Sequence, residues 1–196
     1  YNMVDTMFVG RIDTQATAAV GVAFSAMALI QAISFLFGNG SGNYISRRLG
    51  ARDYRDAERM AATAFFSVLA VGAALCALGA AFVVPIARLL GSTETILPYA
   101  VDYLRVIFFG APFIMGSFVL NNQMRFQGSA SVAMIGIVTG AVLNIALDPL
   151  LIFGLRMGVA GAAWATVLSQ AVSFTLLLAL NLRRAAIKVS PRNFTP

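Results

Sequence analysis

Five long intervals without a charged residue restrict the fold of this 196-residue chain more than any other feature. A helix needs about 20 apolar residues to cross the hydrocarbon core of a bilayer. The intervals contain 33 residues (between Asp13 and Arg47), 28 (between Arg59 and Arg88), 19 (between Arg105 and Arg125), 22 (between Arg125 and Asp148) and 26 (between Arg156 and Arg183). We therefore predict an all-α polytopic membrane protein, an antiparallel bundle of about six transmembrane helices.

The first helix is expected to be truncated, with Tyr1 to about Gly10 as its tail, because the chain starts without an initiator Met or a charged leader. Only 11% of the residues are charged, too few to cover the surface of a soluble domain, where about 25% is usual. We expect residues 1–184 to form an N-terminal transmembrane lobe. Residues 185–196 are interpreted as a cytoplasmic basic linker toward an absent second lobe.

The distribution of basic residues predicts the orientation of the bundle. The segment 47–59, taken as a loop between the second and third helices, has five Arg, the turn near Arg125 has one, and the tail from Arg183 has four basic residues. The opposite side receives three, Arg11, Arg88 and Arg156, while Arg105 lies early in the fourth helix. The positive-inside rule places the side with ten basic residues in the cytoplasm. We therefore expect the net charge of +6 to set topology rather than to bind nucleic acid.

Two acidic residues lie within the expected spans. An acidic side chain at the bilayer centre costs roughly 2.5 to 3.5 kcal/mol on insertion scales, so its presence there calls for a reason. Asp148 lies deep in the fifth helix and Asp5 near the outer end of the first; Asn144 shares a helical face with Asp148, and Pro149 should kink the helix. Oxygen atoms of this kind can bind a hard cation, or the Asp carboxyl can exchange a proton. The sequence leaves both functions open. A purely structural role, paired with another helix, is the alternative for both acids.

Further polar residues lie on the fourth and sixth helices. Thr166, Gln170 and Ser173, at spacings of four and three, form a polar stripe that should face protein or water. Tyr103 and Asn121 are 18 residues apart, about five turns, and share a face if their helix is straight. Ordinary interfacial polarity is an equally good interpretation of Asn121.

Three glycines near the end of the second helix, Gly38, Gly40 and Gly42, have two interpretations. They favour close helix packing through small residues over a hinge or a ligand-lining break.

Enzyme chemistry receives little support. The chain has no His, a single Cys and no nucleophile motif. We expect no enzymatic activity and no cofactor.

Several motifs together resemble the multidrug and toxic compound extrusion (MATE) transporters, in their DinF-like branch. They occur in family order as YNMVDTMFVGRI, AAVGVAF, ISRRLGARD, LNIALDPLLIFG and MGVAGAAWATVLSQ. The resemblance implies the N-terminal lobe of a transporter with two six-helix lobes around a central cavity. Such transporters export mostly cationic, amphipathic compounds in exchange for Na⁺ or H⁺.

The resemblance also implies roles for individual residues. Asp5, Asn144, Asp148 and Thr166 match the cation or proton site of the branch, with a possible Na⁺ at Asp5 and Asp148. Tyr103 and Asn121 match polar residues of the fourth helix in the family. We assign both, together with Gln170, to the substrate cavity.

Two other functions compete with drug export. A lipid or lipid-linked oligosaccharide flippase of the same superfamily would need basic residues in its cavity, and the spans carry almost none. A non-transporting membrane assembly protein would not need buried Asp5 and Asp148. The expected partners are the lipid bilayer, small cationic organic substrates and the missing C-terminal lobe. The expected location is a plasma membrane of the bacterial inner-membrane type.

Overall fold

The computed structural model describes residues 2–10 and 13–194, and within these ranges all side chains except those of residues 2–5, 184 and 192. Six α-helices and two short helical turns follow one another along the chain. They are α1 (Asn2–Val9), α2 (Thr14–Gly50), α3 (Tyr54–Leu89), α4 (Leu97–Phe126), α5 (Ala130–Pro149), a π-helical turn (Leu150–Gly154), α6 (Gly158–Arg184) and a 3₁₀ turn (Pro191–Asn193).

Five of these helices are long and apolar enough to cross a membrane, which confirms the predicted number of complete spans. A helix is favoured there because the hydrocarbon core offers no water to satisfy backbone polar groups. The loop predicted at 47–59 is wrong: α2 continues to Gly50 and α3 begins at Tyr54. Only three residues separate the two helices. Charged residues end the part of a helix that can cross the membrane, but they do not end the helix itself.

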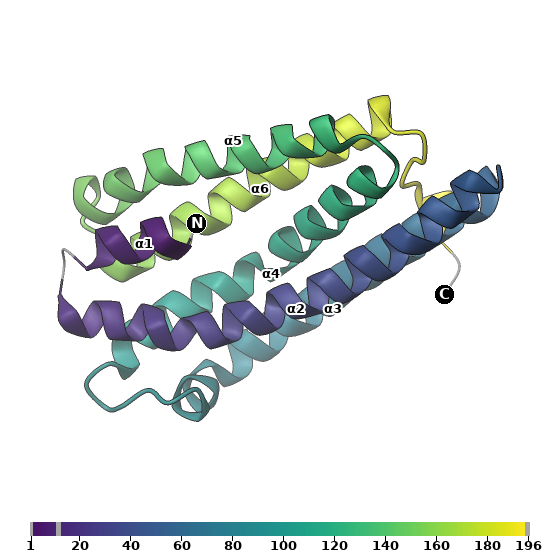
Figure 1. Ribbon diagram of the computed structural model, residues 1–196. Helices are drawn as coiled ribbons and strands as arrows, with labels where there is room; N and C mark the ends of the chain where they lie inside the picture. Colours follow the sequence, from purple (N-terminus) through teal and green to yellow (C-terminus); the bar gives the residue numbers. More distant parts are fainter. Residues whose placement is uncertain (1, 11–12, 195–196) are drawn as a thin grey trace.

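Helix α4 lies at the centre of the bundle. It contacts α2, α3, α5 and α6, and Figure 1 shows it between the α2–α3 pair and the α5–α6 pair. The short connections make successive helices antiparallel, as predicted. As a result α2, α4 and α6 end, and α3 and α5 begin, at one end of the bundle, called here the basic end.

Two of the three glycines late in α2 allow close contact with α4. Gly38 and Gly42 are buried, and an added Cβ would collide with Asn122 at position 38 and with Phe126 at position 42. The packing interpretation is therefore confirmed for these two. It is wrong for Gly40, which is exposed and has open space around it.

Prolines mark two departures from regular helix. In α3, Phe82 has non-helical angles (φ −126°, ψ 24°) three residues before Pro85. Pro85 cannot donate a backbone hydrogen bond and its ring crowds the preceding turn, which explains the kink. Pro149 ends α5, and the backbone then widens into the π-helical turn Leu150–Gly154. The regular α-helical geometry therefore ends at Pro149, next to Asp148.

The segment after α6 folds back onto the basic end. Ile187 and Val189 are buried there, 0% and 3% exposed, in a cluster with residues of α3, α4 and α6. The side chain of Asn181 accepts a hydrogen bond from Val189 N (3.0 Å) and donates to Ile187 O (3.4 Å). Gln127 Oε1 accepts from Ile187 N at 3.0 Å. This segment is therefore packed against the lobe up to at least Val189.

Candidate ion and substrate site

Three of the four residues predicted to bind the coupling ion meet between α5 and α6. Asn144 and Asp148 are one turn apart on α5, and Thr166 faces them from α6. Asn144 Nδ2 lies 3.4 Å from Asp148 Oδ1 and 3.5 Å from Thr166 Oγ1. One amide therefore connects the carboxyl of one helix with the hydroxyl of the next.

This group is closed off from the surface of the lobe. Asn144 and Asp148 are 0% exposed and Thr166 is 2% exposed. Both hydrogen bonds of Asn144 are long, near the limit for such contacts. Its carbonyl oxygen Oδ1 is buried and accepts no hydrogen bond from the described residues. A buried acceptor without a donor is costly, and it is also the kind of atom that a cation can use.

Helix α1 supplies the fourth predicted ligand, Asp5, whose side chain lies outside the described residues. The helix itself packs against both α5 and α6. Val9 is fully buried, and Phe8 stacks edge-on with Phe153 of the π-helical turn at 6.5 Å between ring centroids. The three helices that carry the predicted ion ligands are therefore direct neighbours.

Two of the predicted cavity residues line a common pocket of about 110 Å³. Gln170 of α6 and Asn121 of α4 are 6% and 7% exposed, and Gln170 Oε1 accepts a hydrogen bond from Ser117 Oγ at 2.8 Å. Asn121 Nδ2 donates to the carbonyl of Ala133 at the start of α5, at 2.9 Å. The pocket is lined by side chains of α4, α5 and α6: Ser117, Phe118, Asn121, Ile137, Gln170, Ser173 and Leu177.

Tyr103, the third predicted cavity residue, lies elsewhere. It is fully buried, and its hydroxyl points to Met27 Sδ of α2 at 3.7 Å. It is absent from the residues that line the pocket around Asn121 and Gln170. Eighteen residues of α4, roughly 27 Å of helix, separate it from Asn121.

The polar stripe on α6 is buried along its whole length. Thr166, Gln170 and Ser173 all face protein, as predicted, and Ser173 Oγ donates to the carbonyl of Gly136 at 2.9 Å. Ser117 was not singled out from the sequence. The helical spacing in the sequence indicates this residue, because Ser117 lies one turn before Asn121 on the same face of α4.

The chemistry of the group at Asn144 is that of oxygen donors around one carboxyl. A carboxyl, an amide oxygen and a hydroxyl can hold a small monovalent cation, or the carboxyl can exchange a proton. Within residues 2–10 and 13–194, no three His, Cys, Asp or Glu side chains that the structure describes come together. These residues therefore offer no ligand set for a transition metal.

A family model described as MatE matches residues 1–150, three quarters of the chain. This chain belongs to the MATE family. Its members are transporters, so the MATE chain described here is a multi-pass membrane protein of a transporter family and not an enzyme.

Curated relatives of this MATE chain include multidrug export proteins. It is 35% identical over 174 residues to the multidrug export protein MepA of Staphylococcus haemolyticus, covering 88% of this chain and 38% of the relative. It is 33% identical over 188 residues to MepA of Staphylococcus saprophyticus, covering 95% of this chain and 42% of the relative.

Solved MATE structures match over the whole chain and confirm the fold. A crystal structure of MATE in the bent conformation has a TM-score of 0.93 at 32% identity, covering 100% of this chain and 44% of that one. An inward-facing multidrug resistance MATE transporter gives 0.93 at 33% identity and 45% coverage, and an outward-facing one 0.92 at 32% and 44%. The chain thus spans less than half of the length of the relatives that it matches.

Proposed function

We propose that this lobe belongs to a cation-coupled antiporter that exports cationic, amphipathic organic compounds in exchange for H⁺ or Na⁺. Asp148, Asn144 and Thr166 bind the coupling ion, together with Asp5 of the neighbouring helix. The pocket around Asn121 and Gln170 contributes to the path of the exported compound.

The observation that carries this proposal is the buried group between α5 and α6. A carboxyl removed from water is costly to maintain unless its partners compensate or its charge is used. Here the amide of Asn144 contacts both the carboxyl of Asp148 and the hydroxyl of Thr166, and its oxygen has no donor among the described residues. Such a group suits an ion that enters and leaves better than a permanently closed hydrogen-bond network.

The comparisons support rigid movement of the lobe during transport. It resembles the corresponding part of inward-facing and outward-facing transporters equally well, with TM-scores of 0.93 and 0.92. Alternating access by rocking of two lobes requires little change within each lobe. We therefore propose that the working transporter pairs this lobe with a second one, and that the substrate cavity lies between them.

The same comparisons support a proposal for the location. Relatives from two Staphylococcus species favour a bacterial plasma membrane, of the inner-membrane type in bacteria with two membranes. We propose that the basic end faces the cytoplasm, because positively charged loops are retained there.

Ethidium efflux from cells tests the proposal. The complete transporter, carrying both lobes, is compared with its Asp148→Asn variant under an imposed Na⁺ gradient and, separately, an imposed H⁺ gradient. We expect gradient-driven efflux by the unchanged protein with one of the ions, and loss of this efflux in Asp148→Asn. Asp102→Asn is the matched control, because Asp102 is an exposed carboxyl of α4, and it should leave efflux unchanged.

Other outcomes separate the proposal from its competitors. Equal efflux by the unchanged protein and Asp148→Asn would reduce Asp148 to a structural residue. No efflux by either protein, at normal membrane abundance, would contradict drug export and favour the flippase or the assembly protein.

A further inference from the structure

An arginine cluster lies at the basic end, where α2 turns into α3. Arg52, Arg55 and Arg59 are exposed, and the described residues form no ion pair with any of them. Arg55 and Arg59 are one turn apart on α3, and Arg52 precedes them in the turn. Ala57 and Ala61, which lie on the opposite face of α3, are fully buried against the bundle. The three guanidinium groups therefore point away from the protein.

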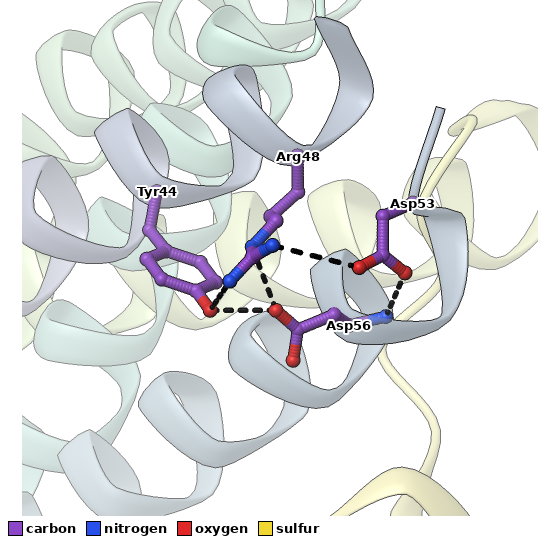
Figure 2. A network of polar contacts seen from close by, with 4 residues as sticks. All are labelled: Tyr44, Arg48, Asp53 and Asp56. Carbon is purple, nitrogen blue, oxygen red and sulfur yellow. Dashed lines mark hydrogen bonds and ion pairs between the residues drawn. The ribbon is translucent and has the colours of Figure 1, made fainter. Parts of the chain in front are cut away.

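Acidic residues of the same turn are held by a different arginine. Figure 2 shows Arg48 of α2 between Asp53 and Asp56: Nε lies 2.8 Å from Asp56 Oδ2, and Nη1 lies 3.6 Å from Asp53 Oδ2. Tyr44 completes the network, because its hydroxyl donates to Asp56 Oδ2 at 2.6 Å and accepts from Arg48 Nη2 at 2.8 Å. Asp53 also caps α3 by accepting from the backbone N–H of Asp56 at 3.2 Å. Arg48 therefore engages both carboxylates.

The third acidic residue of this region is also engaged. Glu58 Oε2 accepts a hydrogen bond from Asn193 Nδ2 of the tail at 3.0 Å. Asn193 is neutral, so Glu58 keeps its negative charge, but none of the three arginines forms an ion pair with it or with another described residue.

The backbone at Arg52 is a second, independent observation. Arg52 has a φ of 59°, the left-handed conformation that glycine adopts at lower energetic cost. The turns after α3 and α4 have glycine in that conformation, Gly91 (φ 99°) and Gly128 (φ 81°). The turn after α2 has an exposed arginine in its place, and so does the turn before α6, where Arg156 has a φ of 55°. A residue kept at a strained position is a reason to look for a role of its side chain.

The face of α3 below this cluster is suited to hydrocarbon chains. Ala70, Ala73 and Ala77 are exposed and apolar. Ala73 and Ala77 follow Arg59 by 14 and 18 residues, close to whole numbers of helical turns, so they lie on the same side of α3 as Arg59. The surface thus presents cations at the basic end of α3 and small apolar side chains further along the same side of the helix.

We propose that Arg52, Arg55 and Arg59 bind the phosphate of an anionic phospholipid in the adjoining leaflet, with its acyl chains along the exposed alanine face of α3. Guanidinium groups bind phosphate oxygens in pairs, which a single lysine cannot do. Each cation near a membrane surface adds about fivefold to the affinity for anionic lipid. This inference does not depend on the proposed transport function.

Native mass spectrometry of the complete transporter in a neutral detergent tests the inference. Phosphatidylglycerol, phosphatidylcholine and inorganic phosphate are added separately, and retained lipid is counted. We expect phosphatidylglycerol to be retained in preference to phosphatidylcholine. The triple variant Arg52→Gln, Arg55→Gln, Arg59→Gln should bind it roughly a hundredfold more weakly.

A matched triple variant removes the same charge from the opposite end of the bundle. Arg88→Gln, Arg105→Gln, Arg156→Gln replaces three exposed arginines and should bind phosphatidylglycerol within about twofold of the unchanged protein. Equal losses in the two triple variants would overturn the proposal, because net charge alone would then explain binding. So would equal retention of the two lipids, or displacement of phosphatidylglycerol by millimolar phosphate.

Two more variants keep the proposal testable if the glutamine triple variant fails to fold. Replacing the three arginines of the cluster by Lys keeps the charge but removes paired hydrogen bonding, so phosphatidylglycerol binding should fall to an intermediate level. Arg48→Gln releases the carboxylates of Asp53 and Asp56 beside the cluster, and should weaken lipid binding several-fold. Binding equal to that of the unchanged protein in both variants would contradict the proposal.

Discussion

Replacing Asn144 by Leu should separate stability from ion coupling at the candidate site. The side chains are similar in size, and the change removes two long hydrogen bonds, of 3.4 and 3.5 Å. Side-chain hydrogen bonds in membrane proteins average about 0.6 kcal/mol, so the loss is about 1.2 kcal/mol. The change also removes a buried carbonyl that has no donor among the described residues, which recovers about 1 to 3 kcal/mol. The change also takes the amide donor away from the buried Asp148 Oδ1, and this cost of about 1 to 3 kcal/mol offsets the gain. We expect a free energy of unfolding within about 1 kcal/mol of that of the unchanged protein.

The assay is thermal unfolding of the complete transporter in a mild detergent, at a fixed scan rate, with and without the coupling ion. At an ion concentration 100 times its dissociation constant, binding should stabilise the unchanged protein by about 2.7 kcal/mol. Asn144→Leu should lose this increment while keeping its midpoint without ion. Asn121→Leu is the control, because Asn121 donates a shorter bond of 2.9 Å to Ala133 O, and it should lower the midpoint. A midpoint without ion that falls as far in Asn144→Leu as in Asn121→Leu would refute the reasoning and make Asn144 a structural residue.

Two further predictions concern packing. Gly38→Val should destabilise the lobe by about 1 to 3 kcal/mol, because its Cβ would lie 2.9 Å from Asn122 Nδ2. Gly40→Val is the control, because its side chain meets open space and the change should be nearly neutral. Equal unfolding midpoints of the two variants would contradict the close contact of α2 with α4. Asn181→Leu removes the two hydrogen bonds of the Asn181 side chain to the segment 185–194, so limited proteolysis should cut this segment faster than in the unchanged protein. An unchanged rate would show that the remaining contacts of the segment hold it without Asn181.

The sequence predicted the spans and the proximity of Asn144 and Asp148 for clear physical reasons. Charge-free intervals mark what the hydrocarbon core accepts, and the structure has helices there. Asn144 and Asp148 were bound to be neighbours because they lie one turn apart. Thr166 came from the polar stripe of α6 and the family resemblance, and the structure places it against Asn144. The role of these residues in binding an ion stays a prediction.

Features that depend on the arrangement of helices could not be predicted in the same way. The segment 47–59 was interpreted as a loop because it is charged, although Arg, Glu and Ala also favour helix. Periodicity placed Tyr103 and Asn121 on one face, but it cannot say which neighbouring helix that face meets. Tyr103 meets Met27, whereas Asn121 meets the start of α5.

The tail was interpreted from its charge alone. Ile187 and Val189 alternate with the exposed Lys188, which is the pattern of a half-buried extended segment. That pattern was the available signal for its packing against the lobe. Whether it also leads to a second lobe stays a prediction.

The central position of α4 has a consequence for how the lobe enters the membrane. The two most buried spans, α4 and α6, have a lower mean hydropathy than the three more peripheral spans. Neighbouring helices bury most of α4, so it can carry the consecutive buried amides Asn121, Asn122 and Gln123 near its end. The transfer of such a helix from water into lipid alone is less favourable in free energy than the transfer of its neighbours. We therefore expect insertion of α4 to be helped by the earlier spans α2 and α3, so that the order of the helices along the chain is also an order of assembly.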